Sequence, residues 1–222
     1  MDRSGFIRRL EGIRDAVQRV GGRILCFEIG EPASMETVRR IEEMYQIQLP
    51  ADFAEMATQV AGTVDVRWSI YDVEGIPKQF SDISSGALYW DIQMYLDQEQ
   101  LESYQDFQNS PEDLPNFQGK LQLLEVPNGD MVLFDLVRPG ERKPIVYINH
   151  DGLFSWPVQL AESFEDYVES LLSIGLAGNE IWQLEKFLQP EPEECADEPP
   201  EPCVIDPGCP YALAWRKMMG LG

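Results

Sequence analysis

Apolar side chains recur every three or four residues in several parts of the N-terminal third, which is the spacing of one helix face. The stretch 6–20 predicts a helix that ends at Gly21-Gly22. A second helix is predicted from Ser34, whose side chain can cap the first turn, to Leu49-Pro50, where proline disfavours helical backbone in the residue before it. A third helix then begins with Pro50, because the first turn does not need the missing N–H.

The next part of the chain alternates apolar and polar residues, which is the period of a half-buried strand. This alternation covers 64–70, and a short apolar run at 87–90 predicts another strand. The earlier run 24–29 is compatible with a strand or a buried connector. Between 92 and 104 the spacing becomes helical again.

The clearest sheet signal lies in the middle of the chain. The runs LQLLEVP (121–127) and DMVLFDLV (130–137) flank Asn128-Gly129, a pair favoured in two-residue type I′ hairpin turns because both residues need positive φ. The runs PIVYI (144–148) and LFSW (153–156) follow after further turn residues. The spacing predicts three or four antiparallel strands in a meander.

The C-terminal third begins with helical patterns and then changes composition. Ser163 stands three residues before an acid and predicts the capped start of a helix, and residues 178–188 predict one more. Residues 189–210 hold seven prolines and seven acids with no base, a composition typical of an extended or disordered segment. The final YALAWRKMMG (211–220) is apolar enough to dock on the body or to bind a partner.

Acidic residues outnumber basic ones over most of the chain. The 222 residues include 39 Asp and Glu against 17 Lys and Arg, a formal net charge of −22. Residues 1–40 differ, with eight arginines against six acids, which favours docking of the first helix on the protein's own acidic body over a separate contact surface. The field as a whole repels nucleic acids and anionic membranes and attracts basic partners, although the same charge also serves solubility alone.

The sequence points to a cytoplasmic protein. Its start has no unbroken apolar core of a secretory signal, and no stretch approaches the length of a membrane-spanning helix. Four cysteines, with Cys26 inside an apolar run, are more typical of a reducing compartment than of a disulfide scaffold.

Motifs for catalysis, metals or cofactors are weak. His150 stands beside Asp151 in the turn Asn149–Gly152, and no motif supplies a nucleophile, so a turn role is favoured over a general base. The spacing of Cys195, Cys203 and Cys209 is wider than zinc sites usually show. The sequence contains no phosphate loop. We therefore predict no catalytic residue, no metal site and no cofactor.

Aromatic residues are more ambiguous, because tryptophan and tyrosine are common both in cores and at binding hot spots. Most are expected in the core, and those that alternate outward are candidate anchors for a partner. Acids in the turns of the meander are most simply interpreted as turn-stabilising residues, but they too can face a partner. The candidate partner-binding residues are Trp68, Tyr71, Tyr89, Trp90, Asp130 and Asp151.

Three blocks in order give the chain a resemblance to a known family. They are the helix–Leu-Pro–helix start in IEEMYQIQLPADFAEMATQVA (41–61), NGDMVLFDLVRPGERKPIVYINHDG (128–152), and LAESFEDYVESLL (160–172), with Trp68 on the strand between the first two. The chain is similar to the SUKH superfamily, which joins fungal cell-wall regulators to bacterial immunity proteins. The resemblance covers about residues 34–175. Ala61-Gly62-Thr63 departs from the Asn-Gly-Gly that family members often carry there.

The resemblance implies an α+β fold with a central, mostly antiparallel sheet, helices packed against it, and no catalytic residues. It also implies a partner, a basic toxin domain of nuclease or deaminase type. The expected organisation is an Arg-rich N-terminal helix and connector (1–33), a core domain (34–175), an added helix (176–188), and a Pro/Glu-rich disordered tail with a short apolar end (189–222).

Three functional hypotheses follow. The first is a non-enzymatic immunity protein that neutralises a bacterial toxin by direct binding. The second is a regulatory scaffold in cell-wall or stress signalling, with the tail recruiting partners. The third, an enzyme that uses His150 and nearby acids, is the least favoured.

Overall fold

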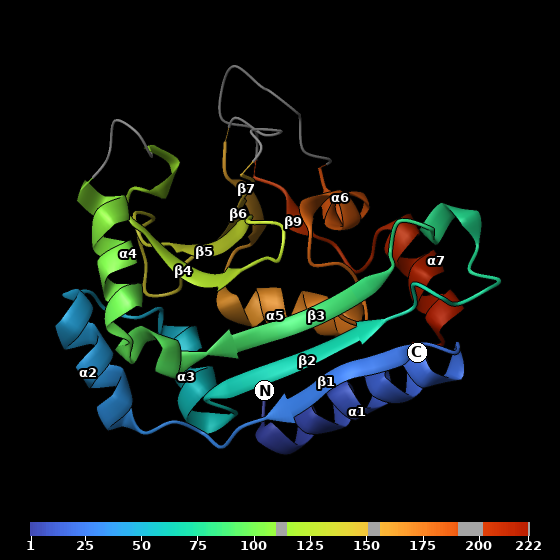
Figure 1. Cartoon of the computed structure of the whole chain (residues 1–222), viewed down its shortest axis with the longest axis horizontal. Helices are drawn as coiled ribbons and strands as arrows, with labels where there is room; N and C mark the ends of the chain where they lie inside the picture. The colour runs from blue at the N-terminus through green and yellow to red at the C-terminus, as the bar shows by residue number, and fades with distance from the viewer. Residues whose placement is uncertain (110–114, 151–155, 191–201, 222) are drawn as a thin grey trace.

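The computed structural model describes residues 1–109, 115–150, 156–190 and 202–221, and within these ranges the chain has the predicted α+β fold (Figure 1). The α-helices are α1 (Arg3–Arg19), α2 (Met35–Tyr45), α3 (Ala51–Gln59), α4 (Gln98–Asn109), α5 (Phe164–Ser173), α6 (Ile181–Leu184) and α7 (Pro210–Met219). The strands are β1 (Arg23–Ile29), β2 (Thr63–Ser69), β3 (Ser85–Asp91), β4 (Lys120–Glu125), β5 (Met131–Asp135), β6 (Ile145–Ile148), β7 (Val158–Ala161), β8 (Leu188–Gln189) and β9 (Val204–Ile205).

The predicted antiparallel pairing is present, and the strands divide into two main sheets. An antiparallel three-stranded sheet has the order β1-β2-β3, and an antiparallel four-stranded sheet has the order β4-β5-β6-β7. The two stay separate partly because the chain after α5 occupies one end of the β3 edge. There Ala87 N donates to Leu176 O (3.1 Å), and Gly178 N donates to Ser85 O (3.0 Å).

One face of the three-stranded sheet packs against α1 and α5. Trp90 on β3 lies between these helices, with its ring centroid 5.6 Å from that of Phe6 and 5.4 Å from that of Phe164. The five apolar residues that face inward from α1 are fully or almost fully buried: Phe6, Leu10, Ile13, Ala16 and Val17. Arg9 on the outer side pairs with Glu169 of α5. The first helix therefore docks on the chain's own body, as its charge predicted.

The hairpin at Asn128-Gly129 forms where we predicted it, but with a different turn. Gly129 has φ +93°, whereas Asn128 is not among the described residues with positive φ. Gly129 N donates to Val126 O (2.8 Å) and Val126 N donates to Asp130 O (2.8 Å), the pattern of a three-residue loop with glycine in the left-handed position. Pro127 explains the difference, because its fixed φ of about −65° suits the first central position of a type I turn.

The C-terminal part of the chain is described in two pieces. Residues 191–201, within the segment predicted to be extended or disordered, lie outside the described ranges, and β9 on their far side pairs antiparallel with β8. Cys203, Ile205 and Cys209 are buried. In α7, Trp215 and Met219 are fully buried, which makes this helix part of the core. The apolar end thus docks on the body, the first of its two predicted roles.

Other predictions differ in detail. The helical pattern from residue 92 begins as a 3-10 helix, Ile92–Leu96, before α4. Most of the predicted strand at LFSW (153–156) lies outside the described residues, and the fourth strand of the meander is β7. The predicted cap is present, since Ser163 Oγ accepts a hydrogen bond from Asp166 N (3.1 Å).

Candidate functional site

Two of the six candidate partner-binding residues belong to the core, so we correct that prediction. Trp68 and Trp90 are 1% and 0% exposed. Their indole N–H groups donate to Gly175 O (3.0 Å) and Ala61 O (2.9 Å), and so neither ring is available to a partner. Both side chains point to the buried face of the sheet, the face that also carries Val64, Val66 and Leu88.

The remaining candidates have different positions. The Tyr71 side chain is 79% exposed in the loop after β2, and Tyr89 is half-buried on the outward phase of β3. Asp130 is only 2% exposed and acts within the fold. Asp151 lies outside the described residues. Tyr71 and Tyr89 therefore remain as candidates for contact with a partner.

Tyr89 stands in a cleft between the two sheets, which we call the inter-sheet cleft. It has a volume of about 270 Å³. Arg67 on its rim forms a bidentate ion pair with Asp65 (2.7 and 2.9 Å), which raises the pKa of Arg67 through that hydrogen bonding. Burial, followed by Asp91 and Asp65, raises the pKa of Tyr89. The cleft is lined by Asp65, Arg67, Ala87, Tyr89, Leu124, Glu125, Val126, Pro127, Val132, Tyr167, Gly178, Asn179 and Leu184.

A second depression, the Tyr71–Trp182 hollow, has a volume of about 460 Å³. Trp182 on α6 is 44% exposed, and Asp82 on the same wall pairs with Lys186 (3.0 Å), which lowers the pKa of Asp82. Sequence reasoning missed Trp182 as a surface residue, because the apolar pattern of 178–188 assigned it to a helix core. The lining residues are Ile70, Tyr71, Val73, Gly75, Ile76, Phe80, Ser81, Asp82, Ile83, Ser84 and Trp182.

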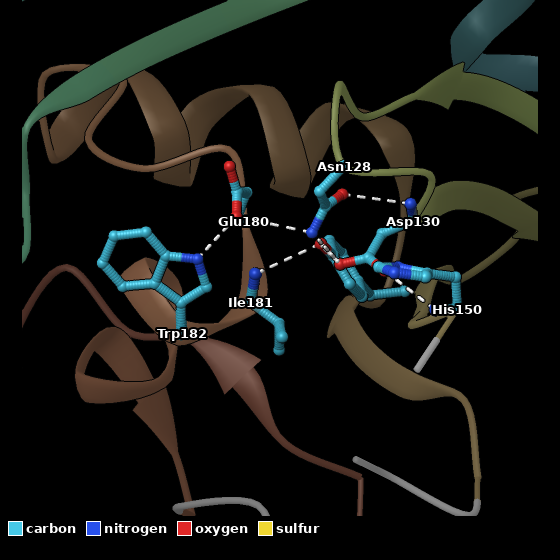
Figure 2. Close-up of polar contacts among 7 residues, drawn as sticks. Asn128, Asp130, His150, Glu180, Ile181 and Trp182 are labelled. Atoms are coloured by element: carbon cyan, nitrogen blue, oxygen red, sulfur yellow. Dashed lines mark hydrogen bonds and ion pairs between the residues drawn. The ribbon is translucent and has the colours of Figure 1, made fainter. Parts of the chain in front are cut away.

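The segment Gly178–Trp182 joins the two depressions, since Gly178 and Asn179 line the first and Trp182 lines the second. Figure 2 shows how it is held: Glu180 accepts from the Trp182 indole N–H (2.6 Å) and from the Asn128 amide (3.4 Å). The Ile181 N–H donates to the Tyr147 hydroxyl (3.2 Å). The β4–β5 hairpin and β6 thereby fix the backbone that carries Trp182.

Asp130 is the centre of this network (Figure 2). Its carboxylate accepts from the Tyr147 hydroxyl, from Asn128 Nδ2 (2.7 Å) and from the backbone N–H of His150 (2.8 Å), and it pairs with His150 Nδ1 (2.7 Å). Burial alone would raise the pKa of Asp130, but these hydrogen bonds together lower it. Burial, reinforced by Asp130, raises the pKa of Tyr147.

His150 pairs with Asp130, which lies twenty residues earlier in the chain, and this pair gives Asp130 a structural role. The turn interpretation of Asp130 from the sequence agrees with Asp130 N donating to Asn128 Oδ1 (3.0 Å) inside the hairpin. Asp130 thus ties the hairpin to the turn after β6, and Asn128 and Tyr147 connect this network to the start of α6.

Three observations in the described part of the chain concern metal binding and membrane-spanning helices. No group of three or more His, Cys, Asp or Glu side chains is placed there to hold a metal ion. Burial raises the pKa of the Cys203 thiol to about 11, which disfavours the thiolate form that metals bind. Among the described residues no helix is both long and apolar enough to cross a bilayer.

Comparison with known families gives one match. The model of the SMI1 / KNR4 family (SUKH-1) matches residues 32–170, more than half of the chain. The match contains β2, β3 and the Asp130 hairpin, whereas α1, α6 and α7 lie beyond it. No curated protein matches the chain.

Proposed function

We propose that this chain, which belongs to the SMI1 / KNR4 family (SUKH-1), neutralises a bacterial toxin by binding it directly. The observation that carries the proposal is the family match over residues 32–170, because toxin immunity is a frequent role in this family. The toxin is of nuclease or deaminase type. The chain itself acts as a non-enzymatic protein-binding module.

Charge supports a basic partner. The net charge of −22 gives a field that steers basic proteins toward the chain. Residues 81–119 contain eight acids and no Lys or Arg. Three of them stand on one face of α4, where Glu99, Glu102 and Asp106 are exposed. Nuclease domains are often basic where they hold nucleic acid, so an acidic binder can cover that surface.

The contact face that we propose combines the inter-sheet cleft and the Tyr71–Trp182 hollow. Exposed Tyr71 and Trp182 are of the residue types enriched at binding hot spots. Trp182 is held by Glu180, so little side-chain freedom is lost when a partner binds.

The direct test is rescue from a toxin. Cells that express the toxin encoded beside this gene are expected to survive when the chain is co-expressed, because binding blocks the toxin's active surface. The purified pair is expected to form a complex whose association rate falls at least about tenfold between 0.05 and 0.5 M salt, roughly as electrostatic steering predicts.

The control is the same toxin with an unrelated acidic protein expressed to the same level. Absence of rescue by soluble, folded chain would contradict the proposal. Recovery of cell-wall synthesis proteins in place of a toxin would replace it with the regulatory-scaffold hypothesis.

Truncation of the exposed aromatics tests the contact face. Tyr71→Ala and Trp182→Ala are each expected to weaken the toxin complex by about 2 kcal/mol, roughly 30-fold in Kd, because each ring fills space that water would otherwise occupy. Isothermal titration calorimetry measures the effect. The stability of each variant is expected to stay within about 0.5 kcal/mol of the parent.

Val137→Ala is the matched control, since Val137 is 69% exposed and lines neither depression. It is expected to leave Kd unchanged. Equal binding by all three variants would place the contact face elsewhere.

A further inference from the structure

The edge of β3 has unused backbone groups beside the inter-sheet cleft. The bonds of Ser85 O to Gly178 N and of Ala87 N to Leu176 O show that these two residues direct their backbone groups away from β2. The register between β2 and β3 runs without a shift from Ser85 to Asp91, so Tyr89 directs its groups the same way. Within the described residues, neither the N–H nor the C=O of Tyr89 has a hydrogen-bond partner.

This unpaired stretch borders a hollow of the size of one or two side chains. Ala87 and Tyr89 form one wall of the inter-sheet cleft, and apolar Leu124, Val126 and Val132 lie among the residues of the four-stranded sheet that line it. Figure 1 shows β3 and β4, which carry several of the lining residues, with α5 behind them. An unpaired strand edge beside an apolar hollow is the arrangement that proteins use to add an extended segment to a sheet.

We propose that an extended segment of the protein partner pairs with the β3 edge from Ala87 to Asp91. The backbone of the segment supplies an acceptor for the Tyr89 N–H and a donor for the Tyr89 C=O. An extended chain presents such acceptors and donors in turn along one edge. Alternate side chains of the segment enter the cleft, and their apolar character matches its lining. This inference rests on the proposed protein-binding function and adds to it the part of the partner that is bound.

Charge and the chain's own structure support this occupant. Asp65, Arg67 and Glu125 on the rim have a combined charge of −1, so a lysine or arginine in the segment fits beside the cleft. The edge is already used in the same manner at its other end, where residues 176–178 pair with Ser85 and Ala87. The partner segment extends that pairing along β3.

The test uses the full chain and a probe peptide of about ten residues, roughly the upper length of a strand, selected on the immobilised protein from a displayed random library. Amide hydrogen exchange is followed by NMR. In the free protein, Tyr89 N–H is expected to exchange at least about tenfold faster than the amides of Leu88 and Trp90, which pair with β2. Addition of the peptide is expected to slow the Tyr89 amide by a similar factor.

A matched pair of variants isolates the backbone bond. Tyr89→Ala and Tyr89→Pro both lose the ring, but only Tyr89→Pro also loses the outward N–H, and proline is tolerated at such edge positions. The peptide is expected to bind Tyr89→Pro up to about tenfold more weakly than Tyr89→Ala, the effect of one hydrogen bond. If Tyr89→Pro does not fold, the exchange measurement on the parent chain decides.

Several outcomes would overturn the inference. They are failure to select a peptide, selected peptides that leave the Tyr89 amide unchanged, or equal binding by two folded variants. Protection of this amide that rises with protein concentration in the free chain would make a second copy the occupant instead. Because the probe is a peptide, these outcomes are independent of toxin rescue: rescue with an unprotected edge rejects only the strand pairing, and a protected edge without rescue rejects only the toxin.

Discussion

Trp215→Ala is expected to lower the free energy of unfolding by about 3–5 kcal/mol, the usual loss for a large aromatic truncated in a core. Trp215 is fully buried, and its ring lies nearly parallel to that of Trp68, with centroids 6.4 Å apart. It contacts Phe80 edge-on at 5.5 Å, and its indole N–H donates to Ile174 O (2.8 Å). The substitution leaves a cavity and removes one of the two hydrogen bonds that Ile174 O accepts at the end of α5, the other coming from Ala177 N (3.4 Å). Urea unfolding monitored by circular dichroism measures the change.

Trp182→Ala is the control for this measurement, since the same side chain is removed from a site that is 44% exposed. It is expected to change stability by no more than about 0.5 kcal/mol. A similar small change for Trp215→Ala would mean that α7 is not part of the cooperative fold. The expected large change would place residues outside the matched range 32–170 among those the core requires.

Local signals in the sequence predicted most elements because each has a local physical cause. The Ser34 and Ser163 caps depend on a side chain and a backbone N–H within one turn, and both are present. The Leu49-Pro50 break ends one helix region and precedes the next because proline restricts its own backbone and that of the residue before it. These signals need no knowledge of the tertiary structure.

Predictions failed where distant parts of the chain decide the outcome. The composition of 189–210 indicated an extended or disordered segment; residues 191–201 lie outside the described part of the chain, and the residues on either side of them pair as β8 and β9, which local composition did not predict. The turn type differs from the type I′ expectation for a local reason, because Pro127 favours a type I turn before Gly129. The α+β class was predicted correctly, whereas the separation of the two sheets depends on residues 176–178 at the β3 edge.

The candidate site was only partly predictable for the same reason. Side chains along a strand alternate between the two faces of the sheet. The sequence alone did not show that Trp68 and Trp90 both lie on the buried face. Trp182 fits a helical stripe, yet α6 spans only Ile181–Leu184 and leaves that ring at the surface. Exposure of a single aromatic thus depends on how long its helix continues, which is set by tertiary packing.

Asp130→Asn is expected to destabilise the protein by about 3 kcal/mol at pH 7, because it removes a buried charge whose hydrogen bonds join the hairpin to Tyr147 and His150. The amide has one acceptor oxygen in place of two, and its NH2 group faces other donors. Urea unfolding measures the loss. Asp106→Asn, at an exposed position on α4, is the control and is expected to change stability by less than about 0.5 kcal/mol.

The loss should also depend on pH in a predictable direction. The folded-state pKa of Asp130 is lowered relative to an unfolded value of about 3.9, so the charged carboxylate stabilises the fold fully above that value. This stabilisation disappears as pH falls through the folded-state pKa, where the folded protein takes up the proton as well. Measured from about pH 5 downward, the stability difference between the parent and Asp130→Asn is therefore expected to shrink below about pH 4. Comparing the two proteins at each pH cancels the titration of the other acids. A difference that stays constant or grows on acidification would show that the Asp130 network contributes through shape alone and not through its charge.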